Sequence, residues 1–522
     1  MASLSKSRFT AFSQCPKRMW LDINKPECAT ITSAVESRFE NGIEVGELAR
    51  GIFGNFTNAV VLKEDGTQNL TEMVNLTELL LSNNTPVVTE ASFSFEDCFC
   101  SVDILKNVFF NEYELYEVKS TTYKPGDEKD LQKKIETYLP DIAYQKWVLT
   151  KLGYIISSAN LICINADYVL PSNGIIVLSD LFTIINMNEY ITTNELNFVE
   201  ERVNEAKLYI NETEDIEYSL GMQCKKPYDC PFIDYCIKQN GLKYPSVMNL
   251  YRAQWKKKIE YLSKGIITFE DVKGLVKSET QKMQIDCTLN NKKRINKDGI
   301  RDFLSTLSYP LYFLDFETMQ SPIPEFPGTK PYQQIPFQYS LHVMNTENGN
   351  DLEHYEFLGN PDEDPRRALA EQLCHDIPKD VCVLAYNKSF EMTRISEMAQ
   401  AFPDLAEHLL NIHDNIKDLM DPFQKCCYYV PEMKDSFSIK SVLPALFPDN
   451  EELNYHNLNE SVQNGSQAMN AFPAMRHMNE SERAQMRKNL LAYCCLDTLA
   501  MVRVLEKLYE AINDTMFVGD YV

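Results

Sequence analysis

A short apolar stretch that ends in two acidic residues constrains the C-terminal half of this chain most strongly. Residues 309–318 read Tyr-Pro-Leu-Tyr-Phe-Leu-Asp-Phe-Glu-Thr, which is typical of a buried β-strand. Side chains two positions apart project from the same face of a strand, so Asp315 and Glu317 should stand side by side. Two adjacent carboxylates repel each other unless a cation lies between them. The stretch therefore predicts a cation-binding strand end.

Two later segments offer further groups for such a cation. Tyr493 and Asp497 are four residues apart near the end of the chain, and on a helix they would share one face. Between these segments, an apolar strand at 381–385 runs into a helix that starts near Asn387 and carries Glu391. These side chains could converge on the strand pair.

The three motifs together resemble those of DnaQ-like 3′–5′ exonucleases of the DEDDy type. A glutamate, Glu391, stands where that family usually has aspartate. The resemblance implies a ribonuclease H-like domain in which two Mg²⁺ or Mn²⁺ ions are bound and Tyr493 orients the attacking water. The implied ligands are Asp315, Glu317, Glu391 and Asp497. The predicted element order, three strands and then alternating helix and strand, is an α/β order.

The rest of this half is predicted less sharply. An irregular segment is expected at 418–461, where Asp418, Asp421 and Asp435 would be loop acids. A closing helix is expected at 480–511.

The first half of the chain has a second acidic pattern, on a predicted β-hairpin at 98–120. Asp103 lies on one arm, and Glu117 and Lys119 lie on the other arm, facing the same way. The trio resembles the PD-(D/E)xK nuclease core, which implies that Asp103 and Glu117 bind Mg²⁺ and that Lys119 positions the water. A cross-strand salt bridge is the alternative interpretation.

Flanking elements are arranged as that core requires. A helix is predicted from about Pro140 to Leu152, followed by a strand at 158–166. Gln145 on this helix resembles the glutamine of the RecB-like branch, and Glu90 on an earlier strand is a second supporting candidate. A capping or core hydrogen bond is the alternative for both. Gly46 occupies the position where many RecB-like nucleases carry a histidine.

The chain has fifteen cysteines, an odd number, and no export signal. Free, buried or metal-bound thiols therefore explain them better than a disulfide framework does. The adjacent pairs 426–427 and 494–495 are expected to be core residues, because neighbouring side chains on a helix or strand point apart.

Four other cysteines form a separate pattern. Cys224, Cys230 and Cys236 lie in one short loop, and Cys15 offers a fourth thiol from the other end of the domain. Structural zinc usually takes cysteine pairs two to four residues apart, and this loop has none. We favour a [4Fe-4S] cluster, with zinc and plain buried thiols as alternatives. The pattern resembles the iron–sulfur nuclease domain of the AddB helicase-nuclease and of RecB-like CRISPR-associated nucleases.

Charge is distributed unevenly along the 522 residues. The formal net charge is −24, which opposes non-specific binding to nucleic acid. Residues 251–301, however, contain 13 Lys and Arg against 6 Asp and Glu, a local charge of +7. Such a basic band is suited to a phosphate backbone. The predicted contacts are Lys256, Lys257, Lys292 and Arg294.

Taken together, these patterns predict an α/β protein with three segments. A RecB-like PD-(D/E)xK domain with an iron–sulfur site is predicted at 1–245, a basic helical connector at 246–302, and a DnaQ-like DEDDy domain at 303–522. The combination resembles an uncharacterised bacterial family. No apolar run approaches the roughly 18 residues that span a bilayer, and no signal peptide is evident, so a cytoplasmic protein without a membrane partner is expected.

The predicted function is metal-dependent hydrolysis of DNA, single-stranded or at resected ends, in repair, processing or defence. One alternative is a nucleic-acid-binding or regulatory protein in which one or both nuclease folds are inactive, as Glu391 and Gly46 would allow. Another is an RNA 3′–5′ exonuclease, because the sequence has no feature that reads the 2′-hydroxyl.

Overall fold

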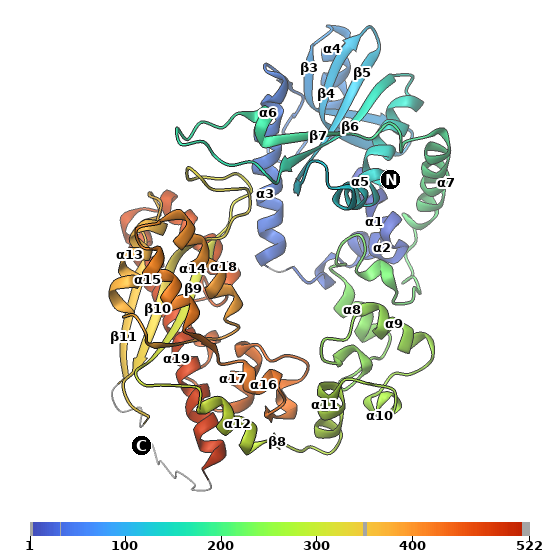
Figure 1. Ribbon diagram of the computed structural model, residues 1–522. Coiled ribbons are helices and arrows are strands. Elements are labelled where there is room, and N and C mark those ends of the chain that lie inside the picture. Colours follow the sequence, from blue (N-terminus) through green and yellow to red (C-terminus); the bar gives the residue numbers. More distant parts are fainter. Residues whose placement is uncertain (1–3, 32, 348–351, 514–522) are drawn as a thin grey trace. The chain divides into compact units, whose positions relative to one another are not determined.

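The computed structural model describes residues 4–31, 33–347 and 352–513 and divides the chain into two compact units (Figure 1). The first unit comprises Met1–Gly241 and Ser321–Gln333, and the second comprises Leu242–Gln320 and Gln334–Val522. The division therefore differs from the predicted one, because the connector clusters with the second unit and residues 321–333 belong to the first. Both units mix α-helices and β-sheets, and none of the described helices is long and apolar enough to cross a bilayer.

Seven of the described strands form the sheet of the first unit, in the order β2, β3, β4, β5, β6, β7, with β1 paired to β4. The antiparallel pair of β4 and β5 confirms the predicted hairpin, and β6 runs parallel to β5. The strands are β1 (Leu4–Ser5), β2 (Thr57–Asn58), β3 (Val87–Phe95), β4 (Cys98–Phe109), β5 (Glu112–Tyr123), β6 (Ile155–Asn165) and β7 (Phe182–Asn186).

Helices cover both faces of this sheet. On one face the apolar side chains of α1, α5 and α7 form a core with the strands, and on the other α3 packs with β5 and β6. The helices are α1 (Lys6–Gln14), α2 (Pro16–Asn24), α3 (Ser33–Ala49), α4 (Leu70–Ser82), α5 (Glu128–Lys151), α6 (Leu178–Leu181), α7 (Thr193–Tyr209) and α8 (Ile233–Gln239).

The predicted start of α5 at Pro140 is wrong, because this helix begins well before the proline. The side chain of Asp127 caps it by accepting hydrogen bonds from the backbone N–H groups of Lys129 and Asp130. A proline inside a helix removes one backbone hydrogen bond, and burial of the helix against the sheet offsets that loss.

The second unit is built on a five-stranded sheet in the order β11, β10, β9, β12, β13. Strands β9, β10 and β11 are antiparallel neighbours, whereas β12 and β13 continue parallel to β9. The strands are β9 (Leu311–Met319), β10 (Ile335–Met344), β11 (Leu352–Leu358), β12 (Cys382–Ala385) and β13 (Ile416–Asp418), and a separate pair joins β8 (Arg294–Ile295) to β14 (Tyr428–Tyr429).

Alternate residues of the central strand β9 face opposite layers of helices. Tyr312 and Leu314 pack toward the layer of α13, α14 and α15, whereas Leu311 and Phe313 pack toward α19. The helices of these layers are α12 (Lys297–Leu304), α13 (Arg366–Asp376), α14 (Ser389–Ala401), α15 (Ala406–Asp414), α16 (Asp421–Gln424), α17 (Ile439–Leu446), α18 (Gly465–Ala474) and α19 (Glu480–Ile512). Asn479 and Glu482 form a capping box that starts α19, so the closing helix begins where it was predicted.

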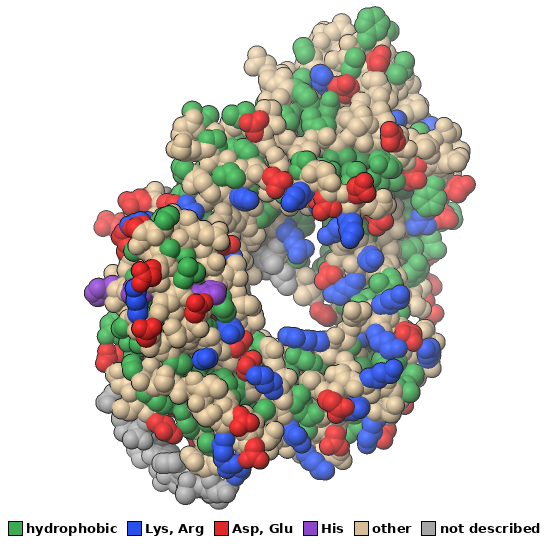
Figure 2. Space-filling view, in the orientation of Figure 1, with side chains coloured by type: hydrophobic (Ala, Val, Ile, Leu, Met, Phe, Trp, Pro, Cys, Tyr) green, Lys and Arg blue, Asp and Glu red, His purple; other side chains and the backbone are tan. Residues whose placement is uncertain are grey.

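A small helical core precedes the sheet of the second unit. It contains α9 (Trp255–Ser263), α10 (Phe269–Val272) and α11 (Glu279–Leu289), whose apolar side chains include Tyr261, Phe269 and Ile285. Figure 2 shows Lys and Arg side chains interspersed with fewer acidic ones on the visible face over these helices.

Candidate metal centres

Four acidic side chains of the second unit gather beside α19. Asp315 and Glu317 project from β9 toward this helix, and an oxygen of each lies within 4.8 Å of the other and of the Cys494 sulfur. Asp497 on α19 and Glu391 in the first turn of α14 are close enough for their charges to act on both strand acids. The structure thus brings together the four acids that the sequence singled out. Cys494, predicted to be a core residue, is buried but contacts Asp315 Oδ2 at 3.8 Å.

The electrostatics of this acidic cluster favour a bound cation. Burial, followed by repulsion from Asp497, raises the pKa of Asp315 and of Glu317 well above the ordinary range. Burial also raises the pKa of Asp497, and burial with the charge of Asp418 raises the pKa of Glu391 to about 8. Within the described part of the chain, the buried Oε2 of Glu391 has no hydrogen-bond partner. Hard divalent cations such as Mg²⁺ and Mn²⁺ suit such a set of oxygen ligands.

A phenol and an ammonium group border the acids. The Tyr493 hydroxyl accepts a hydrogen bond from Lys440 Nζ at 3.0 Å, and the Tyr455 hydroxyl donates to Asp497 Oδ1 at 2.5 Å. Lys440 also lies over both aromatic rings, at 5.2 Å from the centre of Tyr493 and 5.4 Å from that of Tyr455. A side chain at Gly465 would reach 3.8 Å from Glu317 Oε2, so the first residue of α18 lines the same site.

Asn387 and Asp418 build the start of α14 rather than the acidic cluster itself. The backbone N–H of Asn387, a residue in the left-handed region with φ of 67°, donates to Asp418 Oδ1 at 2.9 Å. The Lys388 N–H donates to the other oxygen of Asp418 at 3.3 Å. The side chain of Asn387 accepts from Ser389 Oγ at 3.4 Å and is exposed. Asp418 is therefore not the simple loop acid predicted, because it ends β13 and holds the turn that presents Glu391.

The first unit has its own cluster of charges. Lys119 Nζ donates to Glu117 Oε1 and to Asp141 Oδ2, both at 2.6 Å. Lys6 Nζ donates to both oxygens of Glu117 at 3.0 and 2.9 Å and lies 4.0 Å from Asp103 Oδ1. Asp103 Oδ2 accepts from the backbone N–H of Val118 at 2.7 Å. The structure thus joins the predicted trio and adds Lys6 and Asp141.

Two ammonium groups offset three carboxylates in this cluster. Burial opposes ionisation of Glu117, but Lys119 and then Lys6 bring the pKa of Glu117 below its usual range. Burial and the charge of Glu117 raise the pKa of Asp103 to about 7. Burial also raises the pKa of Asp141. With every group ionised, one negative charge is left over, which suits a further cation.

The two supporting candidates of this unit differ. Gln145 is fully buried on α5, and its Nε2 donates to Glu117 Oε2 at 2.8 Å, so it holds the central acid. Glu90, by contrast, accepts from Arg50 at 2.9 Å and sits in the left-handed region of β3, with φ of 55°. Glu90 therefore forms an ion pair with Arg50, the residue that directly follows α3.

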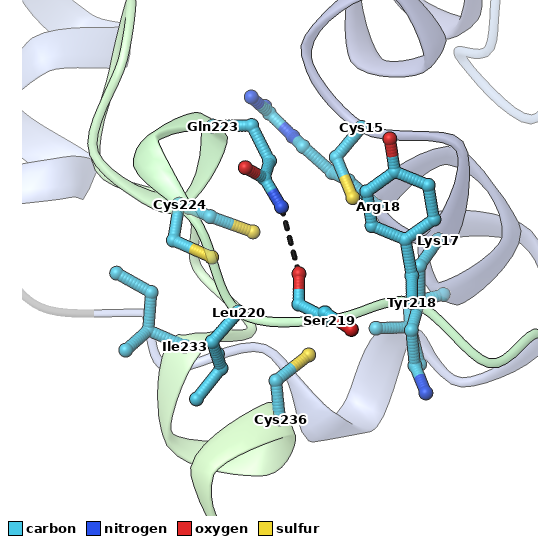
Figure 3. Close-up of a pocket in the computed structure, with 12 residues that line it drawn as sticks. Cys15, Lys17, Arg18, Tyr218, Ser219, Leu220, Gln223, Cys224, Ile233 and Cys236 are labelled. Carbon is cyan, nitrogen blue, oxygen red and sulfur yellow. Dashed lines mark hydrogen bonds between the residues drawn. The ribbon is translucent and has the colours of Figure 1, made fainter. Parts of the chain in front are cut away.

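The four predicted cysteines line one pocket of the first unit. Cys15 joins α1 to α2. Cys224 and Cys230 lie in the segment between α7 and α8, and Cys236 is on α8. Figure 3 shows the sulfur atoms of Cys15, Cys224 and Cys236 directed into the same space. The loop is tied to the first helix, because Gln14 Nε2 donates to two backbone carbonyls of that loop, each at 2.7 Å. Burial raises the pKa of the Cys230 and Cys236 thiols to about 11.

Comparison with known proteins places part of this chain among uncharacterised relatives. Residues 312–438 match the family model described as Domain of unknown function (DUF2779). The matched segment contains Asp315, Glu317, Glu391 and Asp418 but ends before Tyr493 and Asp497. No solved structure matches the chain.

Three curated proteins are similar to this chain. The uncharacterized protein UU173 of Ureaplasma parvum is 28% identical over 235 residues, which are 41% of this chain and 33% of that protein. The uncharacterized protein MG366 of Mycoplasma genitalium is 26% identical over 214 residues, 38% of this chain and 32% of its own length. The MG366 homolog of Mycoplasma pneumoniae is 27% identical over 205 residues, 37% of this chain and 31% of its own. The match thus spans about a third of each relative.

The four residues predicted to contact a phosphate backbone are surface residues of the second unit. Lys256 and Lys257 lie on α9, where Lys257 pairs with Glu260 at 2.9 Å. Lys292 follows α11, and Arg294 lies in β8, where it pairs with Tyr429 of β14. All four are exposed. Two of them thus lie on α9, and the other two lie on the segment between α11 and α12.

The site residues that sequence reasoning missed had weak signals or none. Asp141 precedes Gln145 by four residues, so the sequence already indicated that both lie on the same face of the predicted helix. Lys440 and Tyr455 lie within the segment predicted to be irregular, and Lys6 is far from the hairpin in sequence. Only the folded chain brings these three to the acids.

The raised carboxyl pKa values predict that, when EDTA has removed divalent ions, the free energy of unfolding falls as the pH rises. Between its unfolded value of 4.5 and its folded value of about 8, Glu391 keeps its proton only in the folded state. The unfolded state then binds fewer protons, so the free energy of unfolding falls with rising pH, at up to about 1.4 kcal/mol per pH unit. Urea unfolding of wild type and Glu391→Gln in EDTA from pH 5 to 9 measures this. The wild type should lose stability relative to the variant up to about pH 8, and parallel curves would contradict the prediction.

Proposed function

We propose that this protein is a metal-dependent nuclease that hydrolyses phosphodiester bonds at two sites, one in each unit. The observation that carries the proposal is the convergence of four buried acids, Asp315, Glu317, Glu391 and Asp497, in the second unit. Such a cluster has raised carboxyl pKa values and a buried carboxylate oxygen without a partner among the described residues, and both features favour divalent cations. The element order of the unit, three strands followed by alternating helix and strand, agrees with the resemblance to DnaQ-like exonucleases.

In the second unit, each side chain has a distinct part in the proposed reaction. The four acids would hold divalent ions, which when bound supply Lewis acidity to the phosphate and lower the pKa of water. Lys440 donates to the Tyr493 oxygen and the Tyr493 hydroxyl is a hydrogen-bond donor to Asp497, so the phenol would orient water beside that acid. Tyr455 holds Asp497 in place through its hydroxyl group.

In the first unit, Asp103 and Glu117 are the proposed ligands and Lys119 the group that positions water and offsets phosphate charge. Gln145 fixes Glu117, and Asp141 fixes the Lys119 ammonium at 2.6 Å. These two contacts orient the acid and the lysine independently of the substrate. Lys119 also lies 5.7 Å from the centre of the Tyr138 ring, which covers one side of the ammonium.

The thiol pocket supports an iron–sulfur cluster over zinc. Tetrahedral zinc with bonds of about 2.3 Å holds its sulfurs roughly 3.8 Å apart. Among the described residues, the groups of three or more ligand atoms within 4.8 Å of one another do not include these thiols. The four thiols that line this pocket equal in number the four thiolate ligands of a [4Fe-4S] cluster. It would join α1 and α2 to the loop at 224–236.

A specific observation favours a second candidate for the first unit, a nucleic-acid-binding module without hydrolytic activity. Lys6 Nζ lies within 4.0 Å of three carboxylates, which is where a divalent ion would bind. An ammonium there could replace the ion and leave a structural salt-bridge cluster. For the second unit, RNA is the alternative substrate to DNA.

Digestion of end-labelled substrates tests the proposal. Purified protein is incubated with matched single-stranded DNA and RNA, labelled at the 5′ or the 3′ end, with Mg²⁺, Mn²⁺ or EDTA. We expect products only with a divalent ion, with early release of the 3′ label by the second unit. Binding without metal-dependent cleavage of either polymer would contradict the proposal and favour the binding module.

A further inference from the structure

A cluster of two histidines and a cysteine lies on the sheet of the second unit, outside the acidic cluster. A ring nitrogen of His342, a ring nitrogen of His354 and the Cys495 sulfur all lie within 4.8 Å of one another. The histidines are register partners on β10 and β11, with ring centres 4.5 Å apart, and Cys495 comes from α19. Three elements thus bring one soft and two borderline ligands to one place.

Hydroxyl groups hold both imidazoles by one nitrogen each. His342 Nδ1 is 2.8 Å from Thr498 Oγ1, and His354 Nε2 is 2.9 Å from Ser340 Oγ. The two hydroxyls are themselves 2.7 Å apart, which makes one continuous chain of hydrogen bonds. Among the described residues, these hydrogen bonds use one nitrogen of each ring, which leaves His342 Nε2 and His354 Nδ1 for a further partner. Metal-binding histidines are commonly oriented in this way through the nitrogen that does not touch the metal.

The surrounding charges suit a divalent cation. Glu356 stands two residues after His354 on the same face of β11, and its charge acts on both His354 and Cys495. Arg503, whose charge acts on His342, is itself held by Glu506 at 2.9 Å. The negative charge of Glu356 thus favours a cation beside His354 and Cys495.

We propose that His342, His354 and Cys495 form a site for a zinc-class divalent ion, and that the negative charge of Glu356 favours the cation there. Nitrogen and sulfur ligands select such ions over Mg²⁺, so this site differs in metal from the acidic cluster. The ion would clamp β10, β11 and α19 together. β10 pairs with β9 so that Ser340 lies opposite Asp315, and α19 carries Tyr493 and Asp497. The clamp therefore fixes the elements that present the acids.

Cobalt binding to the full chain tests this site with a readout other than nuclease activity. Wild type, His354→Ala and Cys495→Ser are freed of metal and titrated with Co²⁺ in excess Mg²⁺, which occupies carboxylate sites. His413→Ala is the matched control, because His413 belongs to the same unit and pairs with Asp414 at 2.8 Å. Difference spectra between wild type and each variant cancel the cobalt bound at the cysteine pocket of the first unit.

We expect wild type and His413→Ala to bind one more equivalent of Co²⁺ than His354→Ala and Cys495→Ser. The wild-type minus Cys495→Ser spectrum should contain a thiolate-to-cobalt charge-transfer band and visible bands of tetrahedral cobalt. Zn²⁺ should raise the melting temperature of wild type but not of His354→Ala, whose far-ultraviolet circular dichroism checks folding. Equal stoichiometry in folded wild type and His354→Ala would overturn the proposal, as would an equal loss in His413→Ala.

Discussion

Asp315→Asn is expected to reduce release of 3′-terminal nucleotides by about 10³-fold, because losing one ligand costs several kcal/mol of transition-state stabilisation. Lys119→Ala should leave that activity unchanged and remove the activity of the first unit. The two sets of residues belong to separate units, and distant sites without shared partners behave additively. Initial rates on 3′- and 5′-labelled strands measure both effects.

Two surface variants serve as controls. Asp414→Asn neutralises an exposed acid of the second unit, and Lys106→Ala removes a surface lysine that pairs with Glu114 on the sheet of the first. Both should retain wild-type rates. If Lys119→Ala also abolished the activity lost in Asp315→Asn, one site would account for both activities and the two-site proposal would be wrong.

Cys15→Ser should remove iron and destabilise the first unit while the second stays folded. Anaerobically purified wild type is expected to be brown and to contain about four irons. Cys15 lies more than 200 residues before Cys224, so a shared cluster closes a long loop. A cross-link of that span restricts the unfolded chain by about 5 kcal/mol on the chain-entropy estimate. Iron analysis, visible absorption and two-phase thermal unfolding measure the outcome.

Cys28→Ser is a demanding control for that experiment. Cys28 packs among the same apolar residues as Cys230 and Cys236 but does not line the pocket. The variant should therefore keep its iron. Stoichiometric zinc without visible absorption in the wild type would contradict the cluster, and full iron retention in Cys15→Ser would contradict the role of Cys15.

Sequence reasoning succeeded where function depends on local spacing. The i, i+2 spacing of Asp315 and Glu317 and the i, i+4 spacing of Tyr493 and Asp497 set the direction of these side chains, whatever the rest of the chain does. The predicted start of α19 at Glu480 likewise depends on neighbouring residues, because the structure caps this helix with Asn479 and Glu482. Such features can be predicted because their geometry depends on the backbone period alone.

Sequence reasoning failed where a site depends on contacts between residues that are far apart in the chain. Lys6 meets Glu117 across 111 residues, and Lys440 meets Tyr493 across 53, and no period links such pairs. Pro140 was a misleading signal, because the tertiary environment of α5 tolerates a residue that usually marks a helix start. Cys495, expected to be core, comes next to His342 and His354 only once β10, β11 and α19 assemble.

The segment Ser321–Gln333 belongs to the first unit, although the residues before and after it in the sequence belong to the second. It lies between β9 and β10 of the second unit, yet Ile323 is buried in the core of the first. Leu170 exchanges backbone hydrogen bonds with Gly328 and Thr329 at 2.8 and 3.0 Å, and the Tyr332 hydroxyl donates to the Ser120 carbonyl. An open reading frame cut after residue 241 would thus encode a first unit that lacks part of its own interior. The first unit is therefore complete only when the chain continues through β9 to residue 333.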